Sequence, residues 1–137
     1  MTRYALRWRR DRRGQSLVEF ALGSIVFFTV LFGIVQFGLA VWQYNTVSSL
    51  AQEGARWASV RGSSSTMPAT AAQLQAYVES RSPGFAVTVT ATPTNPSAAA
   101  PGTAISVQVT SSFGLATPLI PAASMTLSST AQMIVSR

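Results

Sequence analysis

The chain has 137 residues, enough for one modest folded domain. It contains no cysteine and no histidine, which excludes disulfides, thiol nucleophiles, Cys/His metal sites and histidine acid–base catalysis. The net charge of +6 would suit a nucleic-acid partner. However, six of the ten arginines precede Gly14. The rest of the chain has four arginines and three glutamates, so its charges nearly cancel. The basicity therefore belongs to an N-terminal leader, and we expect no nucleic-acid partner.

The first 14 residues form a basic leader that ends at Gly14. The stretch from Phe20 to Trp42 is uncharged and strongly apolar. As a helix it would be about 34 Å long, which is enough to cross a hydrocarbon core of about 30 Å. Trp42 and Tyr44 are typical of the far membrane interface, and the leader arginines favour the cytoplasmic side. We therefore expect a single membrane span over residues 20–42, with the C-terminus outside the cytoplasm.

No helix breaker follows this span, so one continuous helix is predicted over 15–61, ending before Gly62. Beyond the span, small and apolar residues recur at helical spacing and predict a buried stripe: Val47, Leu50, Ala51, Gly54 and Ala58. Glu53 and Arg56 lie on the wetter side of the helix. Arg56 can pair with Glu53 or dock against the outer domain, and the sequence leaves both open.

Residues 62–137 predict a small α+β domain outside the membrane. A short helix is expected with Ser65 or Thr66 as its cap and Pro68 in its first turn. Its apolar side would carry Leu74, Tyr77 and Val78, and it would end before Ser82.

Three later stretches alternate at period two and predict strands of an antiparallel sheet. They are 85–90, 105–110 and 125–135, with loops expected over 92–102 and 113–121. The predicted fold class is therefore α+β. A long N-terminal helix would be followed by one short helix and a roughly three-stranded sheet that packs on the helix beyond the membrane.

The spacing of Gly14 and Glu19 carries the main functional signal. A basic leader, Gly14, four residues, Glu19 and a continuous apolar helix together resemble the class III signal of type IV pilins and pseudopilins. That resemblance implies cleavage after Gly14 by a prepilin peptidase on the cytoplasmic side, with the apolar helix retained. Gln15 would then be the new N-terminus, and Glu19 the fifth residue of the mature chain.

The position of Glu19 is costly unless it has a partner. An intramembrane carboxylate costs about 2.5–3.5 kcal/mol or more when it is neither paired nor protonated. In an assembling bundle, Glu19 of an incoming subunit can meet the α-ammonium of Gln15 in its neighbour and so favour one axial register. The alternative is an interfacial carboxylate with no assigned partner, favoured there by the helix dipole.

Three segments resemble TadE-like proteins, the pseudopilin-type subunits of tight-adherence (Flp) pilus systems. They are "GQSLVEFAL" from Gly14, "FGIVQFG" from Phe32, and "GAR" at Gly54, Ala55 and Arg56. The resemblance implies a minor pilin whose partners are the prepilin peptidase, other pilin or pseudopilin subunits, the pilus assembly platform and membrane lipid. Gly54 costs up to about 1 kcal/mol relative to alanine in mid-helix, which favours a role in close helix packing for this segment.

This interpretation places the chain in the bacterial inner membrane, with a cytoplasmic N-terminus and an extracytoplasmic domain. The competing interpretation is an uncleaved single-pass signal anchor whose outer domain binds a partner or a cell-wall polymer. Enzymatic activity is not expected, because the outer domain offers no His or Lys and only Glu79 as an acid. The sequence therefore indicates no catalytic residue, no metal site and no cofactor.

Overall fold

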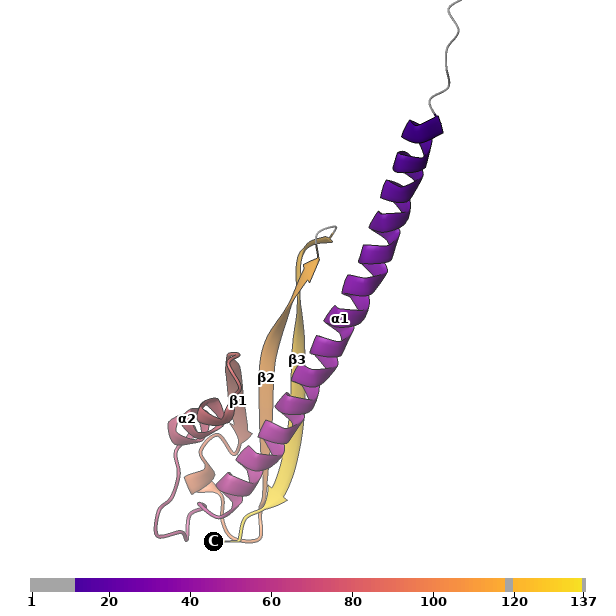
Figure 1. Cartoon of the computed structure of the whole chain (residues 1–137). Helices are drawn as coiled ribbons and strands as arrows, with labels where there is room; N and C mark the ends of the chain where they lie inside the picture. The colour runs from indigo at the N-terminus through magenta and orange to yellow at the C-terminus, as the bar shows by residue number, and fades with distance from the viewer. Residues whose placement is uncertain (1–11, 118–119, 137) are drawn as a thin grey trace, which may run out of the picture. The chain divides into compact units, whose positions relative to one another are not determined.

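The computed structural model of the chain describes residues 12–117 and 120–136. The elements in chain order are α1 (Arg12–Ser59), α2 (Ala71–Arg81), β1 (Val87–Thr92), the short 3-10 helix η1 (Pro96–Ala98), β2 (Ala104–Thr117) and β3 (Ile120–Ile134) (Figure 1). Two compact units meet between Val35 and Gln36. The predicted α+β fold class is confirmed, with one long helix, one short helix and a three-stranded antiparallel sheet.

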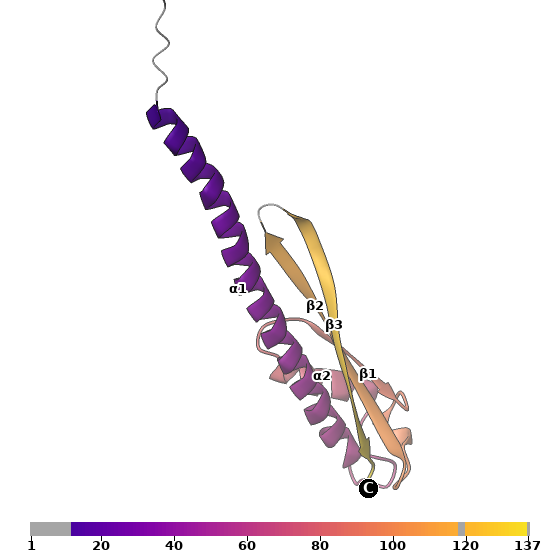
Figure 2. The same ribbon diagram turned by 90° about the vertical axis from the view of Figure 1, so that its right-hand side faces the viewer.

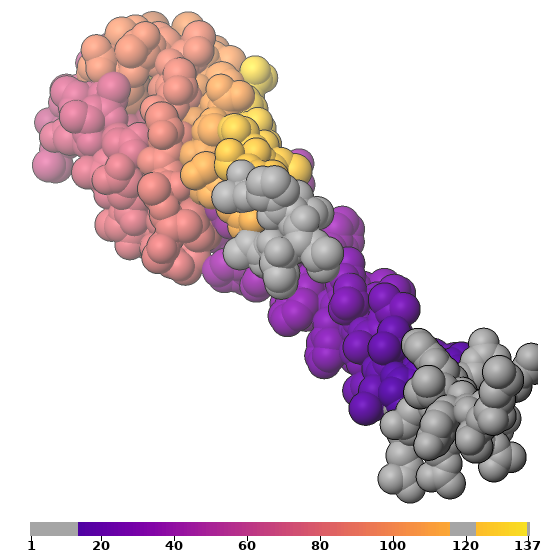
Figure 3. Space-filling model, turned by 90° about the horizontal axis from the view of Figure 1, so that it is seen from above, coloured from indigo at the N-terminus to yellow at the C-terminus, as the bar shows by residue number. Residues whose placement is uncertain are grey.

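The N-terminal unit consists, in its described part, of the first half of α1. This helix is already formed at Arg12, the first described residue and three residues before the expected start at Gln15, and it continues through Gly14 without interruption. From Gly14 to Val35 its residues are mostly apolar and, apart from the half-buried Ser24, exposed; Figure 3 shows the indigo part of α1 with side chains uncovered on the face in view. Among the described residues, α1 is the one helix long and apolar enough to cross a membrane.

The second unit is built on a sheet with the strand order β1-β2-β3 (Figure 2). Both strand pairs are antiparallel; Val89 lies opposite Val109, and Val109 opposite Ser129. Along β2, Ile105, Val107 and Val109 are buried while the residues between them are more exposed. One face of the sheet therefore packs into the core, and the other face, rich in serine and threonine, is open.

The C-terminal half of α1 covers the buried face of this sheet. The predicted stripe of Val47, Leu50, Ala51, Gly54 and Ala58 is confirmed as buried. The apolar members of this stripe form one core cluster with Leu74 and Val78 of α2 and with Ile105, Val107 and Val109 of β2. The helix ends at Ser59, two residues before the expected limit, and is followed by turns and bends.

The start of α2 differs from the prediction. Thr70 is the cap, in place of Ser65 or Thr66, and the helix begins at Ala71. The reason is a capping box: Thr70 Oγ1 accepts from the Gln73 backbone N–H, and the Thr70 N–H donates to Gln73 Oε1 at 3.0 Å. Pro68 precedes the helix. The expected end before Ser82 and the burial of Leu74 and Val78 are confirmed.

The loop predicted over 113–121 is wrong at 113–117 and 120–121, which belong to strands, whereas 118–119 lie outside the described residues. Phe113, Gly114 and Leu115 continue β2, paired with Met125, Ser124 and Ala123 of β3, and an irregularity in register follows between Leu115 and Thr117. Glycine and proline suggested a loop, but a strand with a single neighbour tolerates both. The strands are therefore longer than predicted, with 14 residues in β2 and 15 in β3. The first strand begins at Val87, two residues later than expected.

Candidate functional site

The predicted processing and assembly residues lie on one side of the N-terminal unit. A shallow concave surface on α1 is lined by Gly14, Gln15, Val18, Glu19 and Leu22. Gln15 and Glu19 are four residues apart, which places them about one helical turn from each other on the same face. Both are exposed. Cleavage after Gly14 would therefore create a cation one turn from the Glu19 carboxylate.

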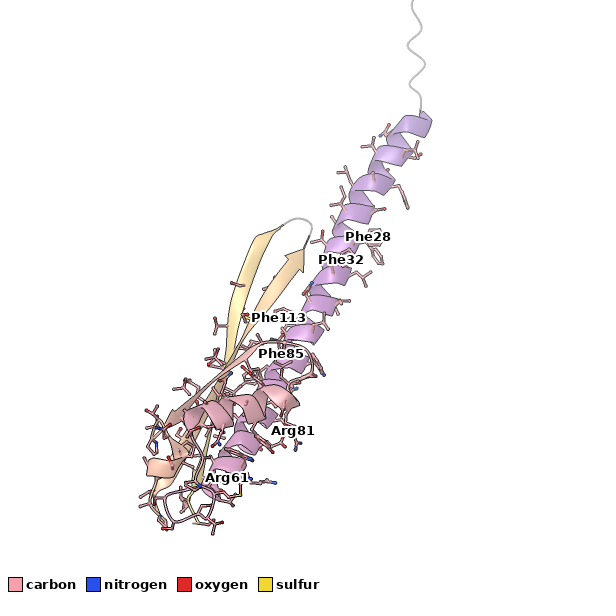
Figure 4. All side chains as sticks on the ribbon, turned by 90° about the vertical axis from the view of Figure 1, so that its left-hand side faces the viewer. Phe28, Phe32, Arg61, Arg81, Phe85 and Phe113 are labelled. Atoms are coloured by element: carbon pink, nitrogen blue, oxygen red, sulfur yellow. The ribbon has the colours of Figure 1, made fainter. Side chains whose placement is uncertain are left out.

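Exposed apolar side chains surround the helix beyond this surface. The large ones between Phe20 and Phe37 are Phe20, Leu22, Ile25, Val26, Phe27, Phe28, Val30, Leu31, Phe32, Ile34, Val35 and Phe37. Figure 4 labels Phe28 and Phe32, whose rings lie 6.4 Å apart on successive turns. Glu19 is the one acid in the described part of the N-terminal unit. An uncovered apolar surface of this extent requires lipid or other helices around it.

Gly54 lies where α1 approaches both α2 and β2. A Cβ atom at this position would meet Val78 Cγ2 at 3.1 Å, Val107 Cγ1 at 3.4 Å and Leu74 Cδ1 at 3.7 Å. The first distance is tighter than nine in ten real Cβ contacts. The absence of a side chain at Gly54 thus permits the close approach of the helix to its two neighbours.

The neighbours of Gly54 in the "GAR" segment have different environments. Ala55 is fully buried in the core cluster. Arg56 is exposed, and the ion pair of Glu53 is formed with Arg81, whose Nη1 lies 2.8 Å from Glu53 Oε1. This pair links α1 to α2, although exposed pairs of this kind contribute only about 0–1 kcal/mol.

A stack of aromatic rings and guanidinium groups joins the two helices beside this ion pair. The rings of Trp57 and Tyr77 are stacked with centroids 5.0 Å apart. Arg61 covers the Trp57 ring at 4.2 Å, and Arg81 lies 5.3 Å from the centre of the Tyr77 ring (Figure 4). Each aromatic ring thus contacts another ring and a cation, an arrangement that stabilises the α1–α2 contact.

The phenol of Tyr77 makes this contact sensitive to alkaline pH. Burial raises the pKa of Tyr77 above 10, and both the hydrogen bond from its hydroxyl to Glu53 Oε1 and the charge of Glu53 act in the same direction. Stability from a raised pKa is fully present below the unfolded-state value of about 10 and is lost as the pH rises toward the folded-state value. We expect the free energy of unfolding, measured with urea at pH 8 and near pH 11, to fall less in Tyr77→Phe than in the wild type. An equal fall in both proteins would contradict this assignment.

Sequence reasoning missed a buried polar contact between α1 and the sheet. Gln43 is 7% exposed, and its Nε2 donates to Ser111 Oγ at 2.9 Å and to the Ser112 carbonyl at 3.3 Å. Ser111 Oγ in turn donates to the Ala86 carbonyl at 2.8 Å. The sequence did contain one sign of this contact. Gln43 lies four residues before Val47, which places it on the same helix face as the buried stripe.

The comparisons with known proteins agree with the sequence motifs. Residues 14–56 match the family described as TadE-like protein. No curated protein and no solved structure matches the chain. The matched region includes Gly14, Glu19 and the "GAR" segment, and the family consists of minor pilins related to tight-adherence pili, which are structural proteins. The resemblance predicted from the sequence is thereby confirmed: over residues 14–56, which carry these motifs, the chain is similar to the TadE-like family.

Proposed function

We propose that the chain is a minor pilin or pseudopilin of a tight-adherence (Flp-type) pilus system. It is held in the bacterial inner membrane by α1, with a cytoplasmic N-terminus, and is processed by a prepilin peptidase after Gly14. It then assembles with other pilin subunits through α1. The observation that carries the proposal is the uncovered apolar surface of α1, which bears Glu19 one turn from the N-terminus that cleavage would create.

The role proposed for Glu19 follows from the free-energy penalty of placing an unpaired carboxylate in lipid. Among the described residues, Glu19 has no ion-pair partner within its own chain. The α-ammonium of Gln15 in a neighbouring subunit supplies a charge of opposite sign at the same level of the membrane. Pairing the two at a helix–helix interface removes much of the penalty that the isolated carboxylate meets in lipid.

The test compares Glu19→Ala with the wild type in cells that contain the peptidase and the other pilus components. We expect Glu19→Ala to insert and to be processed normally, while its recovery in cross-linked or sheared assemblies falls at least about tenfold, equivalent to about 1.4 kcal/mol. Glu79→Ala is the matched control, because Glu79 is an exposed acid on α2. It should assemble as the wild type does.

Two results would contradict the proposal. Normal assembly of Glu19→Ala would show that the Glu19 carboxylate does not determine the axial register between neighbouring subunits. A wild-type protein that retains its leader in the presence of an active peptidase would favour the uncleaved signal anchor with a partner-binding or cell-wall-binding outer domain.

A further inference from the structure

The charged side chains in the described part of the second unit all come from one short stretch of the chain. Residues 36–52 and 82–136 contain no charged residue. The charged residues between them, on the end of α1, just after it and on α2, are Glu53, Arg56, Arg61, Glu79 and Arg81. Recognition of a charged partner by this unit is therefore confined to the surface where α1 meets α2.

An open hollow of about 450 Å³ lies on this surface. The volume falls within the range of about 300–1,000 Å³ that is usual for binding pockets. The hollow is lined by side chains from the end of α1, from the residue after it and from α2, among them Gln52, Glu53, Arg56, Trp57, Val60 and Tyr77.

Arg56 presents a free cation to this hollow. Glu53 lies three residues before it, where a helix would normally let the two pair. However, Glu53 Oε1 lies 2.8 Å from Arg81 Nη1 and accepts a hydrogen bond from the Tyr77 hydroxyl at 3.1 Å. Arg56 is exposed, and among the described residues no ion pair or hydrogen bond reaches its guanidinium. The packing of α2 thus removes the nearest counterion of Arg56.

The wall beside Arg56 is apolar and already held in place. Trp57 and Tyr77 are half-buried and stacked, with ring centroids 5.0 Å apart. Arg61 covers the Trp57 ring at 4.2 Å and donates to the Trp57 carbonyl at 3.3 Å (Figure 4). Val60 is 45% exposed. Tryptophan, tyrosine and arginine dominate the binding energy of protein interfaces, and rings held in advance lose little freedom on binding.

We propose that this hollow binds a segment of a different protein in which a carboxylate lies next to an apolar side chain. The carboxylate pairs with the Arg56 guanidinium, which can donate two parallel hydrogen bonds to it. The apolar side chain lies against Trp57 and Val60. The inference goes beyond the proposed function, because it concerns a surface of the second unit alone.

Two observations select this partner. Glu53 lines the hollow, so a polymer with many negative charges would meet an acid beside the free arginine, whereas a single carboxylate need not. The acids of this unit are also engaged: Glu53 is paired with Arg81, and Glu79 accepts a hydrogen bond from Gln75 Nε2. In its described part, the second unit of another copy therefore offers no free carboxylate.

The sequence contains no lysine, which permits a site-specific test by zero-length cross-linking. Arg56→Lys in the full chain keeps the positive charge and introduces the one ε-amine. A carbodiimide, which takes up the water that is lost, joins this amine through an amide bond to a carboxylate in direct contact. The reaction is run on membranes from the native cells, and mass spectrometry identifies the two residues that are joined.

The matched control is Gln132→Lys, which places an ε-amine at an exposed position of β3 in an uncharged part of the chain. A second variant adds Val60→Ser to Arg56→Lys. Val60 is largely exposed, so its replacement should leave the fold intact while it removes an apolar contact from the hollow.

We expect Arg56→Lys to be joined to a glutamate or aspartate of a different protein, with a yield at least about tenfold above that of Gln132→Lys. Adding Val60→Ser should lower this yield about fivefold, because the apolar contact is lost. A yield that does not depend on Val60 would place the contact outside the hollow and overturn the inference.

Four other results would overturn it. Coupling only to Glu53 of the same chain would mean that the counterion of Arg56 is local. Coupling to Glu79 of a second copy would make that copy the occupant, and coupling to a uronic acid would make it a polysaccharide. A yield no higher than that of Gln132→Lys would leave Arg56 as an ordinary solvated side chain. None of these results involves leader cleavage or Glu19, so the proposed function is tested separately.

Discussion

Replacing Gly54 with valine is expected to lower the free energy of unfolding by about 1–3 kcal/mol. The reason is steric. The first atom of any side chain at this position meets Val78 Cγ2 at 3.1 Å and Val107 Cγ1 at 3.4 Å, and valine adds two methyl groups to it. Both neighbours are buried and packed in the core cluster, so α1 must move away from α2 and β2. Urea unfolding of the full chain in a mild detergent, followed by tryptophan fluorescence, measures the change.

Gly38→Val is the matched control for this prediction. Gly38 lies on the same helix and is exposed, and a Cβ there meets nothing within 4 Å. Valine is a slightly better helix former than glycine, so this variant should be neutral or slightly more stable. If Gly54→Val unfolds at the same urea concentration as Gly38→Val, the close packing at Gly54 does not contribute to stability.

Replacing Gly14 with valine is expected to abolish removal of the leader. A Cβ at Gly14 meets nothing within 4 Å, so the chain should fold and insert as before. A loss of cleavage would then mean that the peptidase requires a residue without a side chain immediately before the cleaved bond. Pulse-chase labelling, with the precursor and the mature chain separated by size, measures the rate.

The control for this variant is Gly23→Val, which places the same side chain nine residues further along an equally uncovered helix face. Its leader should be removed at the wild-type rate. If Gly14→Val is processed at the wild-type rate, the peptidase cuts at another position, and Gln15 is not the mature N-terminus.

Features that depend on local periodicity could be predicted from the sequence. The stripe from Val47 to Ala58 follows helical spacing, and the central residues of all three strands alternate as a half-buried sheet requires. The spacing of Gly14 and Glu19 likewise lies within one short segment, which is why the TadE-like resemblance was visible. The roles of these two residues in processing and assembly stay predictions.

Features that depend on contacts between distant segments could not be predicted. Gln43 and Ser111 are 68 residues apart, and nothing in either segment identifies the other. The extension of the hairpin past Phe113 depends on pairing with Met125 in a stretch whose glycine and prolines suggested a loop. Glu53 had a nearby candidate partner in Arg56, yet the packing of α2 brings Arg81 to it.

The most direct test of the central claim is the intact mass and N-terminal sequence of the wild-type protein recovered from membranes that contain its active peptidase. The account predicts a chain that begins at Gln15, with the first 14 residues removed and the whole apolar helix retained. A chain that still begins at Met1 or Thr2 would contradict it. Glu19 would then be an interfacial acid on an uncleaved anchor.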